Sequence, residues 1–244
     1  MEIRGRTALV TGGAVRVGKA IALELARRGM HVGITYRSSA AEAESTVEEL
    51  RALGVQAHAE RCELRSPEEI ERAVRGIEAA LGPVDVLVNS ASMFERTPLA
   101  EASLDDWDAH LETNLRAPWL LARAVGPGMA ARGEGVIVNI LDVAAERPFK
   151  DYTPYSASKA GLASVTMGLA RDLAPHVRVN AVAPGAVLWG KHANEEYRRS
   201  VLAKTPLGRV GSAEDVARAV AFLAESGDFM TGSTITVDGG RRLV

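Results

Sequence analysis

The chain has 244 residues, of which 47% are hydrophobic and 25% are charged, so it can bury a sizeable core and general disorder is excluded. Its formal net charge of -2 gives no electrostatic reason to expect a nucleic acid or an anionic membrane as a partner. One cysteine excludes an internal disulfide, the five scattered histidines indicate no metal site, and no apolar run approaches a membrane span, so we expect a soluble cytoplasmic protein.

Short runs rich in β-branched residues recur along the chain and predict buried strands, and the longer segments between them have the apolar spacing of helices. Ser66 and Ser212, each followed by acidic residues, predict helix N-caps. The expected strands are Thr7–Val10, Val32–Tyr36, Val55–His58, Val84–Val88, Val136–Ile140, Val177–Val182 and Thr234–Val237. The expected helices are Lys19–Arg28, Ala40–Leu53, Pro67–Leu81, Trp107–Ala131, Pro154–Ala174 and Ala213–Ala224. This alternation predicts one parallel sheet covered by helices on both faces, with ligands bound beyond the carboxyl ends of the strands.

A glycine-rich turn follows the first expected strand and opens a helix, over Thr11–Gly18. Glycine permits positive φ and close backbone approach, and the helix N-terminus offers free N–H groups to a pyrophosphate. The position of this turn predicts a dinucleotide-binding site, whereas a tight turn that binds no ligand is the simpler alternative.

The end of the second strand predicts which dinucleotide is bound. NAD sites place an acidic residue there to bind the ribose hydroxyls, but this chain has Tyr36, Arg37 and Ser38. Arg37 and Ser38 suit a 2′-phosphate, and Arg16 adds a positive charge in the first turn. We therefore expect NADP(H) rather than NAD.

Tyr155 and Lys159 lie four residues apart at the start of an expected helix, so they share one helical face. An ammonium group beside a phenol stabilises the phenolate and is expected to lower the pKa of Tyr155 toward working pH. Such a phenol suits the role of a general acid toward a substrate that receives hydride.

In combination, the motifs of the whole chain resemble those of the short-chain dehydrogenase/reductase family. They are Thr11, Gly12, Arg16 and Gly18 in the first turn, Asn89–Ala91, Asn114, Tyr155, Lys159, Pro184–Gly185, Thr231–Gly232 and Val237–Gly240. The resemblance implies an α/β fold, with a single Rossmann-type doubly wound domain over residues 1–244, a seven-stranded parallel sheet and a homotetramer. It implies that Tyr155 is the acid, that Lys159 lowers its pKa and that Asn114 supports a proton-relay water.

The resemblance also assigns a set of residues to the cofactor. These are Thr11, Gly12, Arg16, Val17, Gly18, Tyr36, Arg37, Ser38, Glu63, Leu64, Asn89, Ser90, Ala91, Tyr155, Lys159, Pro184 and Gly185. Glu63 stands where the family usually has an aspartate against the adenine, and Cys62 beside it is expected to be a buried bystander.

One departure from the family bears on the substrate. Asp142 stands thirteen residues before Tyr155, where most members have a serine that polarises a carbonyl oxygen. A carboxylate cannot donate a hydrogen bond to that oxygen and raises the pKa of a neighbouring phenol, which disfavours ketone reduction. It suits reduction of a C=N bond, because a nearby carboxylate favours the protonated, hydride-accepting nitrogen. An aspartate that only caps a turn is the alternative.

The set Arg16, Ser92, Phe94, Asp142, Tyr155 and Lys159 resembles the pteridine reductase branch of the family. In that branch an aromatic ring at the Phe94 position sandwiches the pterin against the nicotinamide, and the Ser92 and Arg16 positions bond its polar edge or the cofactor phosphates. Core packing is the alternative for Phe94. Leu188 and Trp189 complete the expected substrate residues. The segment 189–207 is expected to form a lid, and the alternative is a solvated surface helix over Asn194–Ala203.

The main hypothesis is therefore an NADPH-dependent reductase of a dihydropterin or dihydrofolate C=N bond. The alternative is a 3-oxoacyl-[acyl-carrier-protein] reductase or a related carbonyl reductase. A non-catalytic NADP-binding sensor is the remote alternative, because a sensor has no need of the Tyr155, Lys159 and Asn114 set.

Overall fold

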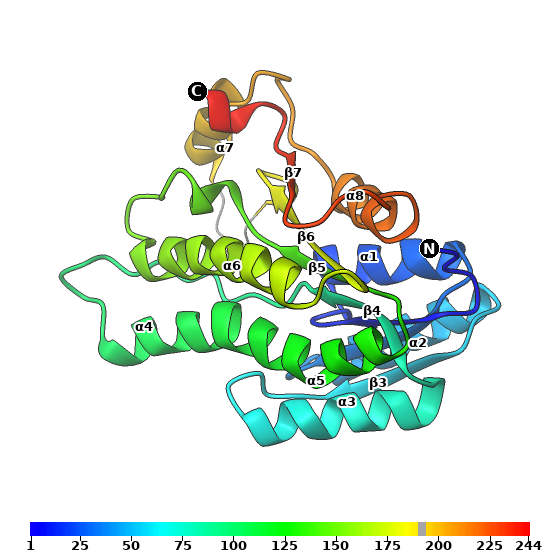
Figure 1. Cartoon of the computed structure of the whole chain (residues 1–244). Helices are drawn as coiled ribbons and strands as arrows, with labels where there is room; N and C mark the ends of the chain where they lie inside the picture. Colours follow the sequence, from blue (N-terminus) through cyan, green and yellow to red (C-terminus); the bar gives the residue numbers. More distant parts are fainter. Residues whose placement is uncertain (190–193) are drawn as a thin grey trace.

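The computed structural model describes residues 1–189 and 194–244, and its described strands form one parallel sheet in the order β3-β2-β1-β4-β5-β6-β7 (Figure 1). The strands are β1 (Thr7–Val10), β2 (His31–Tyr36), β3 (Ala57–Arg61), β4 (Val84–Asn89), β5 (Gly135–Ile140), β6 (Val177–Pro184) and β7 (Thr234–Val237). The chain order reverses between β1 and β4, which is the switch point at which doubly wound folds bind ligands. The predicted seven-stranded Rossmann-type domain is confirmed.

Helices cover both faces of the sheet. They are α1 (Arg16–Arg27), α2 (Ala40–Ala52), α3 (Pro67–Leu81), α4 (Leu104–Leu111), α5 (Ala117–Ala131), α6 (Thr153–Asp172), α7 (Glu195–Ala203) and α8 (Ala213–Glu225), with short turns η1 (Glu112–Arg116), η2 (Val143–Ala145) and η3 (Arg241–Leu243). On one face α1, α2 and α8 bury Ile21, Val47 and Val216 in a shared core. On the other face, Ile77 of α3 and Leu121 of α5 lie in a second core. No described helix combines the length and apolar character that a membrane span requires.

Local capping explains where several helices begin. The Ser66 hydroxyl accepts a hydrogen bond from the Glu69 N–H at 3.2 Å, as predicted. Ser212 forms the reciprocal capping box with Asp215, and Ser103 forms another with Asp106. Each cap satisfies an N–H group that the first helical turn leaves free.

Most predicted boundaries are within two residues of those in the structure, and three elements differ by three residues or more. The helix expected at Trp107–Ala131 instead begins at Leu104 and is divided into α4, the π turn η1 and α5. The third strand is Ala57–Arg61 rather than Val55–His58, because the register of β2 pairs Val32 with Ala57 and Tyr36 with Arg61. The first helix begins at Arg16 rather than Lys19, so it includes part of the glycine-rich turn.

Arg16 has a backbone φ of 55°, in the left-handed region that favours glycine. Arginine, unlike glycine, has a Cβ that crowds the backbone in this region, so Arg16 is held in a strained conformation. We expect Arg16→Gly to raise the free energy of unfolding by about 1 kcal/mol, the strain relieved less the added chain entropy of glycine. The melting temperature would then rise by about 2–4 °C. An unchanged or lower melting temperature would show that Arg16 carries no net strain.

Candidate active site

The polar residues singled out in the sequence gather at the carboxyl ends of β1, β4, β5 and β6. The hydroxyl oxygen of Thr11, which follows β1, accepts hydrogen bonds at 3.0 Å from the N–H groups of Ser90 and Ala91, which follow β4. Pro184 ends β6, and the Gly185 N–H donates to the Val237 carbonyl oxygen at 3.0 Å. These contacts bring the strand ends into one site.

The N-terminus of α1 has the features of an anion site. Its N-cap, Val15, provides no side-chain cap, and its first turn has no acidic residue, unlike the capped α3, α4 and α8. A Cβ on Gly18 would collide with the carbonyl oxygen of Gly12, so the turn is closed by glycine. Val17 lies half-buried in the same turn. The N–H groups and helix dipole of this turn therefore suit a pyrophosphate.

The end of β2 presents positive charge without an acid. Arg37 and Ser38 are exposed directly after Tyr36, and Arg16 is exposed across the first turn. Within residues 1–189 and 194–244, neither Arg16 nor Arg37 forms an ion pair with a carboxylate. Both guanidinium groups can therefore receive an anionic ligand.

The segment after β3 is fixed by local hydrogen bonds. The Glu63 carboxylate accepts a hydrogen bond from the Arg65 N–H at 3.1 Å, and Leu64 is buried. Cys62 is buried, and burial raises the pKa of its thiol to about 11. The thiol is therefore protonated at neutral pH, and Cys62 is buried as expected.

A buried chain of polar side chains joins β4, β5 and α6. Asn89 Nδ2 donates to Asn139 Oδ1 at 2.8 Å, and Asn139 Nδ2 donates to the Thr166 hydroxyl oxygen at 2.9 Å. Among the described residues, Asn89 Oδ1 is buried and has no hydrogen-bond partner. A buried acceptor without a donor suits a ligand hydroxyl. Asn139 and Thr166 were not predicted as site residues, although an asparagine inside an apolar strand is a signal for such a chain of polar side chains.

Asn114 lies in the π turn η1 and links two segments of the site. Its Nδ2 donates to the Met93 carbonyl oxygen at 2.9 Å and to the Ser158 hydroxyl oxygen at 3.0 Å. Its Oδ1 accepts from the Met93 N–H at 2.8 Å and from the Ser92 hydroxyl at 3.3 Å. Asn114 thus fixes the loop after β4 against α6, and its contact with Ser158 was not predicted.

Tyr155 and Asp142 meet directly in the site. The Tyr155 hydroxyl donates to Asp142 Oδ2 at 2.9 Å, and Asp142 Oδ1 accepts from the Ala144 N–H at 2.8 Å. Asp142 therefore caps the η2 turn, as the alternative interpretation expected, and also contacts the Tyr155 hydroxyl; its role in the reaction stays a prediction. Burial raises the pKa of Asp142, against the lowering effects of the Ala144 and Tyr155 hydrogen bonds and of the Lys159 charge.

The expected effect of Lys159 on Tyr155 is wrong for this structure. Burial, followed by the Asp142 charge and hydrogen bond, raises the pKa of Tyr155 well above its usual value. Lys159 Nζ lies 5.8 Å from the centre of the Tyr155 ring and donates to the Ile140 carbonyl oxygen at 2.8 Å. Burial lowers the pKa of Lys159 to about 8. The ammonium group is thus directed at the end of β5 rather than at the phenol oxygen.

An aromatic group borders Tyr155. Phe94 is 47% exposed, so core packing is wrong for this residue. Its ring stacks on Tyr152 with centroids 4.6 Å apart and planes 11° apart, and it meets the Tyr155 ring edge-on at 4.7 Å. Leu188 is partly exposed, and the Arg198 guanidinium carbon lies 5.4 Å from the centre of the Trp189 ring. Part of the expected lid, 190–193, lies outside the described residues.

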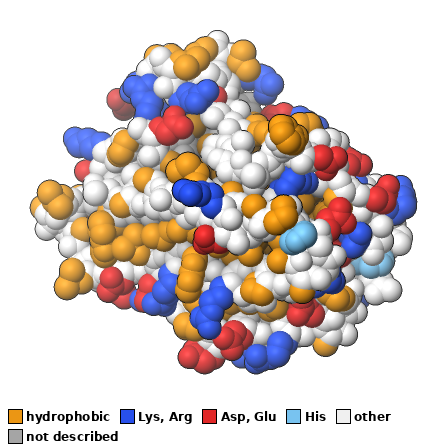
Figure 2. All heavy atoms as spheres, in the orientation of Figure 1, with side chains coloured by type: hydrophobic (Ala, Val, Ile, Leu, Met, Phe, Trp, Pro, Cys, Tyr) orange, Lys and Arg blue, Asp and Glu red, His pale blue; other side chains and the backbone are white. Residues whose placement is uncertain are grey.

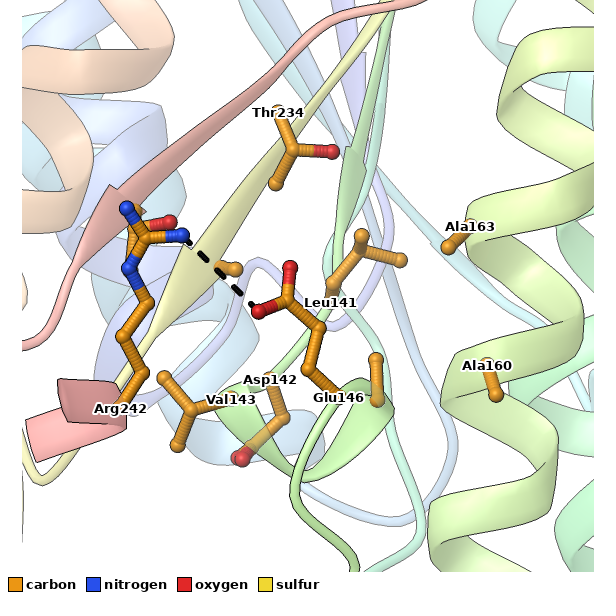
Figure 3. Close-up of a pocket in the computed structure, with 11 residues that line it drawn as sticks. Leu141, Asp142, Val143, Glu146, Ala160, Ala163, Thr234 and Arg242 are labelled. Carbon is orange, nitrogen blue, oxygen red and sulfur yellow. Dashed lines mark ion pairs between the residues drawn. The ribbon is translucent and has the colours of Figure 1, made fainter. Parts of the chain in front are cut away.

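A pocket of about 120 Å³ adjoins the site at Asp142 (Figure 3). Figure 3 shows the Glu146–Arg242 ion pair across it, Thr234 of β7 at one end and the Asp142 carboxyl group at the other. Ala160 of α6 contributes to its wall, whereas Tyr155 and Phe94 do not line it. The pocket is therefore distinct from the side of Asp142 that faces the phenol.

Comparison with known proteins identifies the family. A family model described as enoyl-(acyl carrier protein) reductase matches residues 13–242. The chain is 37% identical over 244 residues to the 3-oxoacyl-[acyl-carrier-protein] reductase FabG of Pseudomonas aeruginosa, covering 98% of each chain. It is 34% identical over 239 residues to FabG of Staphylococcus epidermidis, covering 96% of this chain and 98% of that protein. The chain belongs to the short-chain dehydrogenase/reductase family.

Solved structures of similar proteins agree with this fold. A dehydrogenase/reductase from Sinorhizobium meliloti superposes with a TM-score of 0.89 at 39% identity, covering 98% of this chain and 96% of that chain. A blue fluorescent protein from a metagenomic library, crystallised with NADPH, superposes with a TM-score of 0.92 at 36% identity over 99% of both chains. This short-chain dehydrogenase/reductase is thus an oxidoreductase, and its likeness to the pteridine reductase branch stays a prediction from the six quoted residues.

Proposed function

We propose that this short-chain dehydrogenase/reductase uses NADPH to reduce a C=N bond of a dihydropterin or dihydrofolate. The observation that carries this proposal is the 2.9 Å hydrogen bond from the Tyr155 hydroxyl to Asp142. A carbonyl oxygen needs hydrogen-bond donors, and an ionised Asp142 supplies none and engages the phenol. A nitrogen that must be protonated gains from the same carboxyl group, because a nearby anion favours its protonated form.

Each residue of the site has a separate role in the proposed reaction. When bound, NADPH supplies the hydride; the first turn, Arg37 and Ser38 would hold its phosphates, and Lys159 would hold its nicotinamide ribose. Tyr155 delivers the proton to the substrate nitrogen, and the Asp142 carboxylate holds the phenol in place by accepting its hydrogen bond at 2.9 Å. Asn114 supports the proton relay. The exposed ring of Phe94 stacks on the flat substrate, with Ser92 and Arg16 at its polar edge.

The remaining parts of the proposal concern the lid and the assembly. Leu188, Trp189 and α7 would cover the substrate. The homotetramer that the resemblance implies is supported by Trp119 of α5 and Met167 of α6, which are 44% and 54% exposed. Figure 2 shows hydrophobic side chains gathered over α6 and the neighbouring helix. Sedimentation at several protein concentrations would measure the subunit number.

A second candidate function is 3-oxoacyl-[acyl-carrier-protein] reductase. The identities of 34–37% to proteins of that name over nearly the whole chain favour it. In this case a protonated Asp142 would donate to the substrate carbonyl oxygen in place of serine. The raised pKa of Asp142 gives that form a wider pH range than a free aspartate has.

Steady-state assays of the purified protein separate these functions. Dihydrobiopterin, dihydrofolate and a 3-oxoacyl thioester are each supplied with NADPH, and nicotinamide absorbance is followed. The proposal expects turnover of a pterin or folate substrate at a kcat/KM above that of the thioester. Thioester turnover without pterin turnover would overturn it in favour of the second candidate. Tight NADPH binding without turnover of any of the three would instead indicate the non-catalytic sensor.

Cofactor preference gives a separate prediction at the end of β2. Arg37→Asp replaces the exposed guanidinium by the acid that binds ribose hydroxyls in NAD sites. A charge-assisted hydrogen bond contributes about 1.5–3 kcal/mol, so we expect the KM for NADPH to rise about 10- to 100-fold. The KM for NADH should be unchanged or lower. Arg75→Ala on α3, where Arg75 pairs with Glu71 at 3.8 Å, is the control. Equal effects of Arg37→Asp on both cofactors would contradict a 2′-phosphate site at Arg37.

A further inference from the structure

Asp151 holds together the loop after β4 and the loop before α6. Its carboxylate Oδ2 accepts a hydrogen bond from Arg96 Nη2 at 2.7 Å, and the two groups form an ion pair. Its backbone carbonyl oxygen accepts from the Thr97 N–H at 2.6 Å and from the Thr97 hydroxyl at 3.4 Å. Thr97 is buried, so the backbone contact is shielded from water. We call these three contacts of Asp151 the loop clasp.

The backbone at Asp151 is itself unusual. Its φ is 64°, in the left-handed region that residues other than glycine rarely adopt, although aspartate tolerates it better than most. Such a conformation persists where the surrounding contacts fix it. Here the fixing contacts are those with Arg96 and Thr97, and the next residue, Tyr152, is the N-cap of α6. The clasp therefore sets where the helix bearing Tyr155 begins.

The two loops carry the aromatic pair beside Tyr155. Phe94 precedes Arg96 by two residues, and Tyr152 directly follows Asp151. Their rings stack with centroids 4.6 Å apart, and Phe94 also contacts the Tyr155 ring at 4.7 Å. Phe94 is 47% exposed, so about half of its side chain has no packing partner and packing alone does not hold the ring in one position. Because each ring is attached close to the clasp, the clasp determines how closely the two loops, and hence the two rings, approach.

We propose that Asp151 and Arg96 are positioning residues for substrate specificity, acting by holding the Phe94–Tyr152 pair as a fixed wall for a flat ring next to Tyr155. This rests on the proposed function, because a flat heteroaromatic substrate is what such a wall selects. Neither residue supplies a proton to the reaction. The clasp therefore acts on the KM for a flat substrate and leaves kcat nearly unchanged.

Four variants test this proposal. Asp151→Asn keeps the tolerance of positive φ and the backbone carbonyl but removes the charge, and Arg96→Ala removes the partner. Because this ion pair is partly exposed, we expect each change to raise the KM for dihydrobiopterin about three- to fivefold and to change kcat by less than about twofold. Arg96→Lys keeps the positive charge and should restore most of the affinity. Arg75→Ala, an exposed arginine paired with Glu71 on α3, is the matched control.

A measurement without substrate separates this proposal from the proposed function. The Thr97 amide donates to Asp151, so its hydrogen exchange reports the clasp directly. We expect exchange about threefold faster or more in Asp151→Asn and Arg96→Ala than in Arg75→Ala. Should the protein reduce only 3-oxoacyl thioesters, the proposed function fails, and faster Thr97 exchange still supports the clasp. The proposal is overturned if Asp151→Asn and Arg96→Ala have the same Thr97 exchange rate and the same KM as Arg75→Ala.

Discussion

Replacing Asp142 by serine is expected to exchange one substrate class for another. The variant loses the carboxyl group that binds the Tyr155 hydroxyl at 2.9 Å and gains a hydroxyl donor. We expect kcat/KM for a dihydropterin to fall about 10²- to 10⁴-fold, the usual contribution of a positioned acid–base group. Activity on a 3-oxoacyl thioester should rise about tenfold or more, because a donor now faces the carbonyl oxygen. Parallel assays on both substrates measure the change.

The pH dependence of pterin reduction provides a second test of the role of Asp142. Burial raises the pKa of Asp142, and the proposal needs the ionised carboxylate, so pterin reduction by the unmodified protein should decline as pH falls through that pKa. A second decline is expected above pH about 8, where the buried Lys159 loses its proton. Asp142→Asn abolishes the first decline and shifts the second to lower pH, because the Asp142 charge raises the pKa of Lys159. If Asp142→Ser lowers kcat/KM for the dihydropterin and for the 3-oxoacyl thioester equally, Asp142 does not select between the two substrates.

Replacing Tyr155 by phenylalanine is expected to abolish nearly all reduction of either substrate class. The change removes the proton donor and leaves the ring in its contact with Phe94. We expect kcat to fall about 10³-fold. Binding of NADPH, measured by its fluorescence, should weaken less than about tenfold, since most of the residues assigned to the cofactor are unchanged.

The stability of Tyr155→Phe checks that the loss is chemical. Asp142 Oδ2 loses its hydroxyl donor, which costs about 1–3 kcal/mol. We therefore expect the melting temperature to fall by no more than about 12 °C. Residual activity above about a tenth of the unmodified value would contradict a role for Tyr155 as the acid.

Features that arise from local sequence were predictable. The seven strands follow from short β-branched runs, and the starts of α3 and α8 follow from Ser66 and Ser212, because a cap and its partner lie three residues apart. The place of Tyr155 and Lys159 on one helix also follows from spacing. The end of β3 could not be predicted in this way. It is set by the pairing of Arg61 with Tyr36 of the neighbouring strand rather than by the apolar run at Val55.

Features that depend on distant partners were not predictable. Asn114 reaches Met93 and Ser158, and no pattern within residues 112–116 reveals that a π turn is needed to bring it there. The Lys159 ammonium binds the Ile140 carbonyl oxygen, nineteen residues away, rather than influencing the phenol as expected. The stack of Phe94 on Tyr152 likewise joins two loops whose approach is set by tertiary contacts.

The π turn also affects how relatives of this chain can be compared. A π turn contains one residue more than a regular turn, and one residue occupies about 100° of an α-helix. The side chains of α5, including Leu121 and Val125 in the core, are therefore rotated relative to a straight continuation of α4. A homologue shorter by one position within residues 112–116 could keep the apolar side chains of α5 facing the core only by turning the asparagine at position 114 outward. A single-position gap in an alignment at this point would accordingly mark members that have lost the asparagine's contacts.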